Sequence, residues 1–264
     1  MSAKFNQILF VDSLPEGENT AARLYANVSD WAHVMEQTPA IVSKRVLSAD
    51  AFIALLHECA DLAREQPYVP LLHIECHGRE EGLEFADGSQ LTWADMKPAF
   101  VALNQATKLN LIVIVAACFG GAISGSARVE ERAPFWAFLA PKREIGAGIL
   151  EDAFSVFYQT LLRTRSSEQA MAALRGTEAG KEFWQLSAHT IFRMVAEAYE
   201  AHHLTDDAVQ RQAARLRAMV AQHGAVWSQA QIEAKIRDPA IFEGFRRTFF
   251  MIDLFPEHVE RFPN

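Results

Sequence analysis

Two strand-like apolar runs that each end in a reactive residue constrain the fold of this chain most strongly. One run, LIVIVAAC, ends in Cys118, and the other, LLHIECH, ends in His77. A nearly unbroken series of Leu, Ile and Val suits a strand that is covered on both faces, as in the middle of a parallel sheet. Reacting groups gather at the carboxyl ends of such strands, because only the strand exits meet solvent. The sequence therefore predicts an α/β fold in which His77 and Cys118 stand at one sheet edge.

Short β-rich runs alternate with longer amphipathic stretches over most of the chain. This alternation is typical of βαβ crossovers, so we expect a mostly parallel sheet of about six strands flanked by helices. A hairpin signal, Asp87-Gly88, lies within residues 82–92, and residues 183–194 fit a sixth strand and a helix start equally well. The other expected strands are residues 5–13, 40–47, 71–77, 111–118 and 135–140, and the expected helices are residues 19–35, 49–65, 92–103, 148–162 and 167–180.

The character of the chain changes near residue 193. Beyond it we expect helices at residues 194–202, 206–222 and 228–237, followed by a Phe-rich tail. The sequence thus predicts an α/β domain over residues 1–193 and a helical C-terminal extension over residues 194–264.

Composition narrows the classes of function. The chain carries 33 acidic and 25 basic residues, and the basic ones are scattered, which argues against a nucleic-acid surface. We find neither a leader-like start nor a run of about 18 apolar residues, so we expect a cytoplasmic protein without a membrane segment. Three cysteines are too few for a disulfide scaffold, and an odd number leaves at least one thiol free.

The joint placement of His77 and Cys118 indicates a Cys-His dyad. Either residue alone has an ordinary interpretation, because buried cysteines are commonly inert and single histidines are commonly structural. One βαβ crossover separates them, and neighbouring parallel strands lie about 5 Å apart, so the two side chains are expected to meet. The imidazole would raise the thiolate fraction and then protonate the leaving amine.

The glycines beside the dyad have a mechanical purpose in this interpretation. Gly78 would let the chain turn sharply, while Gly120 and Gly121 would let a substrate carbonyl approach the backbone. The amides of Gly78 and Cys118 are the expected oxyanion-hole donors. Residues 119–134, rich in Gly, Ser, Arg and Glu, are predicted to form a mobile surface loop able to cover the site, with Arg128 and Arg132 as candidate self-cleavage points.

A metal site is the alternative for the same segment. His73, Glu75 and His77 alternate along one predicted strand and could converge on zinc. The spacing His-x-Glu also occurs in zinc deaminases, but those enzymes need a downstream Cys-x-x-Cys, which this chain lacks. The dyad is the favoured hypothesis, and on it the site contains no metal.

These residues resemble the caspase-like cysteine peptidases, and among them the bacterial CHAT type, which is also similar to separase. Residues 73–96, HIECHGREEGLEFADGSQLTWADM, look like that family's histidine segment, and residues 113–121, VIVAACFGG, look like its nucleophile strand. The resemblance covers about residues 69–180. It implies a caspase-like fold, hydrolysis of peptide bonds, catalytic roles for His77 and Cys118, oxyanion donation by the Gly78 and Cys118 amides, and no metal or organic cofactor.

Two positions bear on substrate preference. Basic-specific relatives often carry an acidic residue after the first strand and another two positions before the nucleophile; here these positions are Asp12 and Ala116. Asp12 could hold a guanidinium group or cap a turn, and both readings stay open.

Two classes of function follow. The first is a cysteine endopeptidase that acts on proteins or peptides and is regulated by an activating protein partner or by self-processing. The second is a catalytically silent caspase-like module that binds a protein, and the presence of both dyad residues favours the first.

Overall fold

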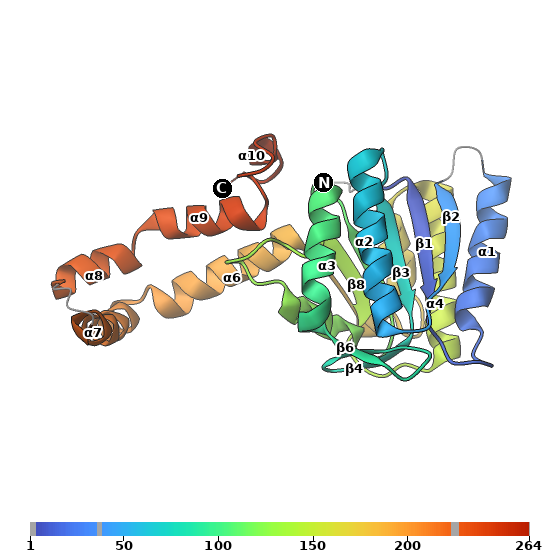
Figure 1. The fold of residues 1–264 in the computed structure, drawn as a ribbon, viewed down its shortest axis with the longest axis horizontal. Coiled ribbons are helices and arrows are strands. Elements are labelled where there is room, and N and C mark those ends of the chain that lie inside the picture. The colour runs from blue at the N-terminus through green and yellow to red at the C-terminus, as the bar shows by residue number, and fades with distance from the viewer. Residues whose placement is uncertain (1–3, 36–38, 223–226, 264) are drawn as a thin grey trace. The chain divides into compact units, whose positions relative to one another are not determined.

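One six-stranded, mostly parallel sheet organises the first part of the chain (Figure 1). The protein is described by a computed structural model that covers residues 4–35, 39–222 and 227–263. Every neighbouring pair of strands except the last is parallel, so the predicted α/β fold with a mostly parallel sheet is confirmed. In spatial order the strands are β2 (Ala40–Arg45), β1 (Gln7–Asp12), β3 (Pro70–Glu75), β7 (Ile112–Ala116), β8 (Ala137–Pro141) and the antiparallel β9 (Phe183–Ser187).

The register of the central strands aligns their carboxyl ends. Asp12 of β1 pairs with Glu75 of β3, and Glu75 pairs with Ala116 of β7. Strand β3 is buried at every position and β7 at all but its first, as their apolar sequences predict for strands covered on both faces. His77 and Cys118 follow the aligned ends by two residues each, so both leave the sheet at the same edge.

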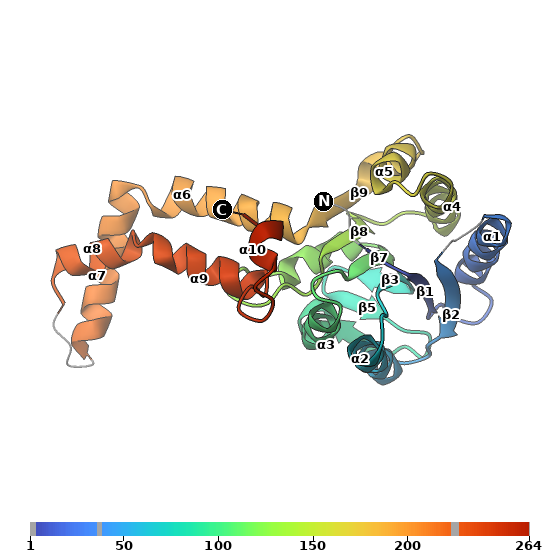
Figure 2. The ribbon, with the colours of Figure 1, turned by 90° about the horizontal axis from the view of Figure 1, so that it is seen from above.

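Helices cover both faces of this sheet (Figure 2). Their apolar residues recur at helical spacing, as in the Phe52, Leu55, Leu56 and Cys59 stripe, and Ser48 caps that helix by accepting a hydrogen bond from the Ala51 N–H. One face carries α1 (Thr20–Val34), α4 (Ala147–Thr164) and α5 (Ser167–Arg175), and the other carries α2 (Ala49–Glu65) and α3 (Trp93–Ala106).

A second, small antiparallel sheet follows β3 directly. It consists of β4 (His77–Arg79), β5 (Gly82–Glu84) and β6 (Gln90–Thr92). The predicted turn joins β5 to β6, and Gly88 there has φ of +83°, a conformation that glycine adopts without strain. Thr92 then begins α3 with a capping box shared with Asp95. His77 is therefore the first residue of a hairpin sheet, separate from the strand that precedes it.

The segment after Cys118 differs from the predicted mobile loop. Residues Gly120–Ser126 form a 3-10 helix, η1, in which Gly120, Gly121, Ile123 and Ser126 are buried. A Cβ on Gly120 would lie 2.8 Å from Cγ1 of Val115, so its small size permits close packing on β7. The small residues of this segment allow close packing, and the prediction of a surface loop was wrong for residues 120–126.

The C-terminal part of the chain is helical. Residues 183–194 contain both structures that the sequence allowed, because β9 ends at Ser187 and α6 (Ala188–His203) starts immediately after it. The chain divides into two compact units, residues 1–128 with 133–188 and residues 129–132 with 189–264. The remaining helices are α7 (Asp206–Gln222), α8 (Gln229–Ile236), α9 (Pro239–Phe249) and α10 (His258–Arg261).

The second unit has its own apolar core. Val209 and Ala213 of α7 pack with Ile232 and Ile236 of α8. Within this unit the guanidinium of Arg132 forms a bidentate ion pair with Asp253, at 2.7 and 2.9 Å. In the stretches that the structure covers, none of the helices combines the length and the apolar character that crossing a bilayer requires.

Candidate active site

His77 and Cys118 line one small pocket at the aligned strand ends. Its volume is about 70 Å³, and Ala116 contributes to its wall. The Cys118 side chain is partly exposed, and its Sγ lies 4.0 Å from the carbonyl oxygen of Ile145. The His77 side chain is 49% exposed. The structure thus places a thiol and an imidazole, supplied by two different sheets, at the same opening. The other residues of the lining are Leu14, Glu18, Thr20, Glu75, Cys76, Ala117, Ile145, Ala147, Leu150, Glu151 and Phe154.

Gly78 brings the two segments into main-chain contact. A Cβ at this position would lie 2.0 Å from the carbonyl oxygen of Cys118, 2.9 Å from its amide nitrogen and 2.9 Å from Cβ of Ala117. No side chain fits in that space, so only glycine permits the approach. The sequence predicts a sharp turn at Gly78, and the structure shows a further reason for glycine there, because the residue makes room for the main chain of Cys118.

The three cysteines differ in accessibility. Cys59 and Cys76 are buried, whereas Cys118 is partly exposed, and none of them forms a disulfide. Burial raises the pKa of the Cys59 thiol, and burial together with the charge of Glu75 raises the pKa of Cys76 well above its usual range. Both buried thiols therefore stay protonated, and Cys118 alone meets solvent at the pocket.

Glu18 is a residue of the site that the sequence did not reveal. Its Oε1 lies 3.2 Å from Nε2 of His77, and both side chains are about half exposed. The two residues are far apart in sequence, and Glu18 belongs to a turn of polar residues before α1, where a carboxylate carries no signal of its own. Only the folded arrangement shows that the histidine has a carboxylate partner.

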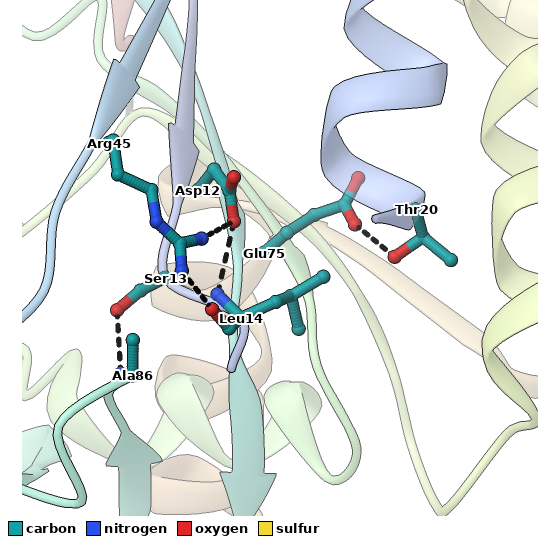
Figure 3. Close-up of polar contacts among 7 residues, drawn as sticks. All are labelled: Asp12, Ser13, Leu14, Thr20, Arg45, Glu75 and Ala86. Carbon is teal, nitrogen blue, oxygen red and sulfur yellow. Dashed lines mark hydrogen bonds and ion pairs between the residues drawn. The ribbon is translucent and has the colours of Figure 1, made fainter. Parts of the chain in front are cut away.

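Asp12 anchors the start of the loop between β1 and α1 (Figure 3). Its Oδ1 accepts a hydrogen bond from the Leu14 N–H at 3.0 Å and pairs with the guanidinium of Arg45, which also donates to the carbonyl oxygen of Leu14. Asp12 does not line the pocket. Asp12 thus caps the turn, and the guanidinium group that it holds belongs to Arg45 of the same chain.

Two of the other predicted substrate-binding residues also lie away from the pocket. Gly120 and Gly121 are buried in η1 and do not line the opening, and a Cβ on Gly121 would lie 3.1 Å from the ring of Trp184 and 3.2 Å from the carbonyl oxygen of Pro141. Their small size serves packing. Ala116, in contrast, is part of the pocket wall, where its methyl group adds no charge.

The fold places His77 outside the strand that holds the other two residues of the alternative metal hypothesis. His73 is fully buried, with Nε2 3.1 Å from Oε1 of Glu75 and Nδ1 2.9 Å from the hydroxyl of Tyr158. Thr20 donates to the other oxygen of Glu75 at 3.0 Å (Figure 3). His77 lies beyond the end of β3 in the hairpin sheet. Among the residues that the structure describes, no three His, Cys, Asp or Glu side chains form a group able to hold a metal ion.

No protein-family model and no curated protein matches this chain. The function of this chain must therefore be inferred from its own residues and from the geometry of the pocket.

Substituting Gly78 tests the main-chain contact. We expect Gly78→Ala to lower the free energy of unfolding by about 2 kcal/mol or more, because the added methyl group must displace the backbone of Cys118. Gly125→Ala is the matched control, since nothing lies within 4 Å of a Cβ there, and its change should stay within about 0.5 kcal/mol. Urea unfolding of both variants measures the difference, and equal stabilities would contradict the contact.

Substituting Tyr158 tests the buried hydrogen bond to His73. Burial and the charge of Glu75 raise the pKa of Tyr158, so its hydroxyl stays protonated. Tyr158→Phe leaves Nδ1 of His73 without its partner, and we expect a loss of about 1–3 kcal/mol in unfolding free energy. Tyr25→Phe, on α1 of the same unit, should change it by less than about 0.5 kcal/mol. A Tyr158 variant as stable as the control would show that the bond contributes nothing.

The accessibility of the thiols predicts selective alkylation. With iodoacetamide at neutral pH we expect Cys118 to react at least about tenfold faster than Cys59 or Cys76. The selectivity should persist as the pH passes the ordinary thiol value of about 8.5, because burial raises the pKa of the other two. Peptide mapping by mass spectrometry measures each rate, and unfolded protein, in which all three should react alike, is the control. Faster labelling of Cys76 would contradict the described burial.

Proposed function

We propose that this chain is a cysteine endopeptidase with Cys118 as nucleophile and His77 as general acid and base. One observation carries the proposal: an accessible thiol and an imidazole from two sheets line one pocket, and Gly78 packs against the main chain of Cys118. A thiol and an imidazole at a shared opening are the groups that nucleophilic acyl transfer requires. The resemblance of residues 73–96 and 113–121 to the CHAT-type caspase-like peptidases supports the same assignment.

The proposed reaction proceeds through an acyl-enzyme. His77 takes the proton of the Cys118 thiol, and the thiolate attacks the carbonyl carbon of the scissile peptide bond. The tetrahedral intermediate collapses when the imidazolium protonates the leaving amine, which breaks the C–N bond and leaves a thioester. Water, deprotonated by His77, then attacks the thioester carbonyl and releases the carboxylic acid product and the thiol.

The amides of Gly78 and Cys118 are the proposed oxyanion donors. In support, the amide nitrogen of Cys118 lies 2.9 Å from the position of a Gly78 Cβ, so the two main-chain segments are adjacent. A preorganised amide aimed at the developing negative charge typically contributes about 3 kcal/mol of transition-state stabilisation.

Proteins or peptides are the proposed substrates, and the cytoplasm is the proposed compartment. The three free cysteines suit a reducing environment, in which a catalytic thiol stays available. Ala116 stands where basic-specific relatives carry an acidic residue, so this position imposes no preference for a cationic side chain. A protein partner that activates the enzyme, and self-cleavage after Arg128 or Arg132, remain part of the proposal.

A peptide-library digest that scans the residue before the cleaved bond tests the proposal. We expect cleavage by the wild type, only background cleavage by Cys118→Ala, and a fall in kcat/KM of about 10²–10⁴-fold for His77→Ala. Cys59→Ala and His57→Ala, which alter residues of the same types on α2, should keep the activity. The intact mass of concentrated protein reports self-cleavage in the same samples.

The variants also decide between the two classes of function. Activity that survives in Cys118→Ala or His77→Ala would end the dyad assignment. Folded wild-type protein that cleaves no library member would favour the catalytically silent module that binds a protein.

A further inference from the structure

The loop between β1 and α1 is fastened at both of its ends. At its start, Asp12 and Arg45 hold the main chain of Leu14 (Figure 3). At its end, Thr20 donates to the carboxylate of Glu75 at 3.0 Å. These contacts join the loop to β2 and β3, and three of its residues, Leu14, Glu18 and Thr20, line the pocket.

The same loop is tied to the hairpin sheet that supplies His77. The amide of Ala86 donates to the hydroxyl of Ser13 at 3.1 Å (Figure 3), and the amide of Ser13 donates to the carbonyl oxygen of Glu75 at 2.8 Å. Ser13 is fully buried. One hydrogen bond therefore ties the loop to the hairpin sheet and another ties it to the end of β3, and both are made by the buried Ser13.

A tight turn inside the loop presents Glu18. The N–H of Glu18 donates to the carbonyl oxygen of Pro15 at 3.1 Å, and Gly17 adopts φ of +95°, which glycine accepts without strain. The turn puts Oε1 of Glu18 3.2 Å from Nε2 of His77, and both residues line the pocket with Cys118.

The contact between Glu18 and His77 determines which nitrogen of the imidazole carries the hydrogen. A carboxylate only accepts hydrogen bonds, so Nε2 of His77 must be the donor. In a neutral imidazole the other nitrogen, Nδ1, is then the acceptor. Both side chains are about half exposed, so water screens the attraction between them. The contact therefore contributes little to stability, and its main effect is to orient the His77 ring.

We propose that Glu18 is a positioning residue that holds the His77 ring and selects its Nε2–H tautomer, leaving Nδ1 for the thiol. This inference rests on the proposed function. On this proposal the β1–α1 loop supplies a third residue, Glu18, that orients the histidine of the Cys-His dyad, and the sequence alone did not reveal this residue.

The other charged groups around the histidine are already engaged. In the pocket, Glu75 is held by His73 and Thr20, and Glu151 pairs with Arg23. The pocket's remaining titratable groups are the thiols of Cys76 and Cys118. On the hairpin sheet, the carboxylate of Glu84, opposite His77 in the register, accepts from Arg79 and Gln90.

Three substitutions of Glu18 separate hydrogen-bond acceptance from a merely structural contribution. Glu18→Gln keeps an acceptor oxygen, Glu18→Leu removes it at similar size, and Glu18→Lys replaces it with a donor that favours the wrong tautomer. We expect kcat near the wild-type value for Gln, about tenfold lower for Leu and lower again for Lys, with KM unchanged. The same substitutions at Glu16, an exposed residue of the same turn, should have no effect.

The rate of Cys118 alkylation by iodoacetamide gives a readout that does not need peptide cleavage. This reagent is uncharged, so the charge of the variant does not steer it, and we expect the rates to follow the same order of Gln, Leu and Lys. If cleavage depends on Cys118 and His77 but all Glu18 variants match the wild type in both assays, the positioning role is wrong and the peptidase stands. If no peptide is cleaved while the alkylation order holds, the positioning role stands and the peptidase is wrong.

Discussion

The contact between the main chains of Gly78 and Cys118 is the constraint on which the candidate site depends. It joins the hairpin sheet to the segment that follows β7, at a separation that excludes every side chain larger than hydrogen. The parallel register prepares this contact by aligning the ends of β3 and β7, and the apolar character of both strands fixes that register in the core. The placement of the imidazole and the thiol at one pocket thus begins with the burial of two strands.

Much of the fold could be predicted from the sequence, because hydrophobic periodicity and caps act locally. The Val and Ile content of residues 112–116 predicts the strand before Cys118, and the capping pattern at Thr92 predicts the start of α3. Residues 120–126 misled the prediction, since Gly and Ser are typical of exposed loops and also of close packing. Whether such a segment is exposed or closely packed depends on which side chains lie beside it in the folded chain, such as Val115 beside Gly120. A single sequence does not show these neighbours.

The candidate site was only partly predictable for a related reason. His77 and Cys118 stand out because each ends an apolar run, whereas Glu18 lies in a polar turn far away in sequence and has no such context. The sequence suggests Asp12 as a substrate-recognition residue and Glu75 as a metal ligand. In the structure both accept hydrogen bonds that fasten the β1–α1 loop. Strand-end carboxylates are visible in a sequence, but their partners are fixed only by the folded chain.

Because His77 and Cys118 come from different sheets, local unfolding of one sheet is enough to take the candidate site apart. His77 belongs to a hairpin of three strands, each of three residues, and Cys76 is the only residue between that hairpin and β3. Small elements of this kind can detach in a local unfolding event at much lower cost than the melting of a whole sheet. Partial opening of the hairpin sheet would withdraw the imidazole from the pocket while the main sheet stays intact, so heating would disrupt the candidate site before the whole chain unfolds.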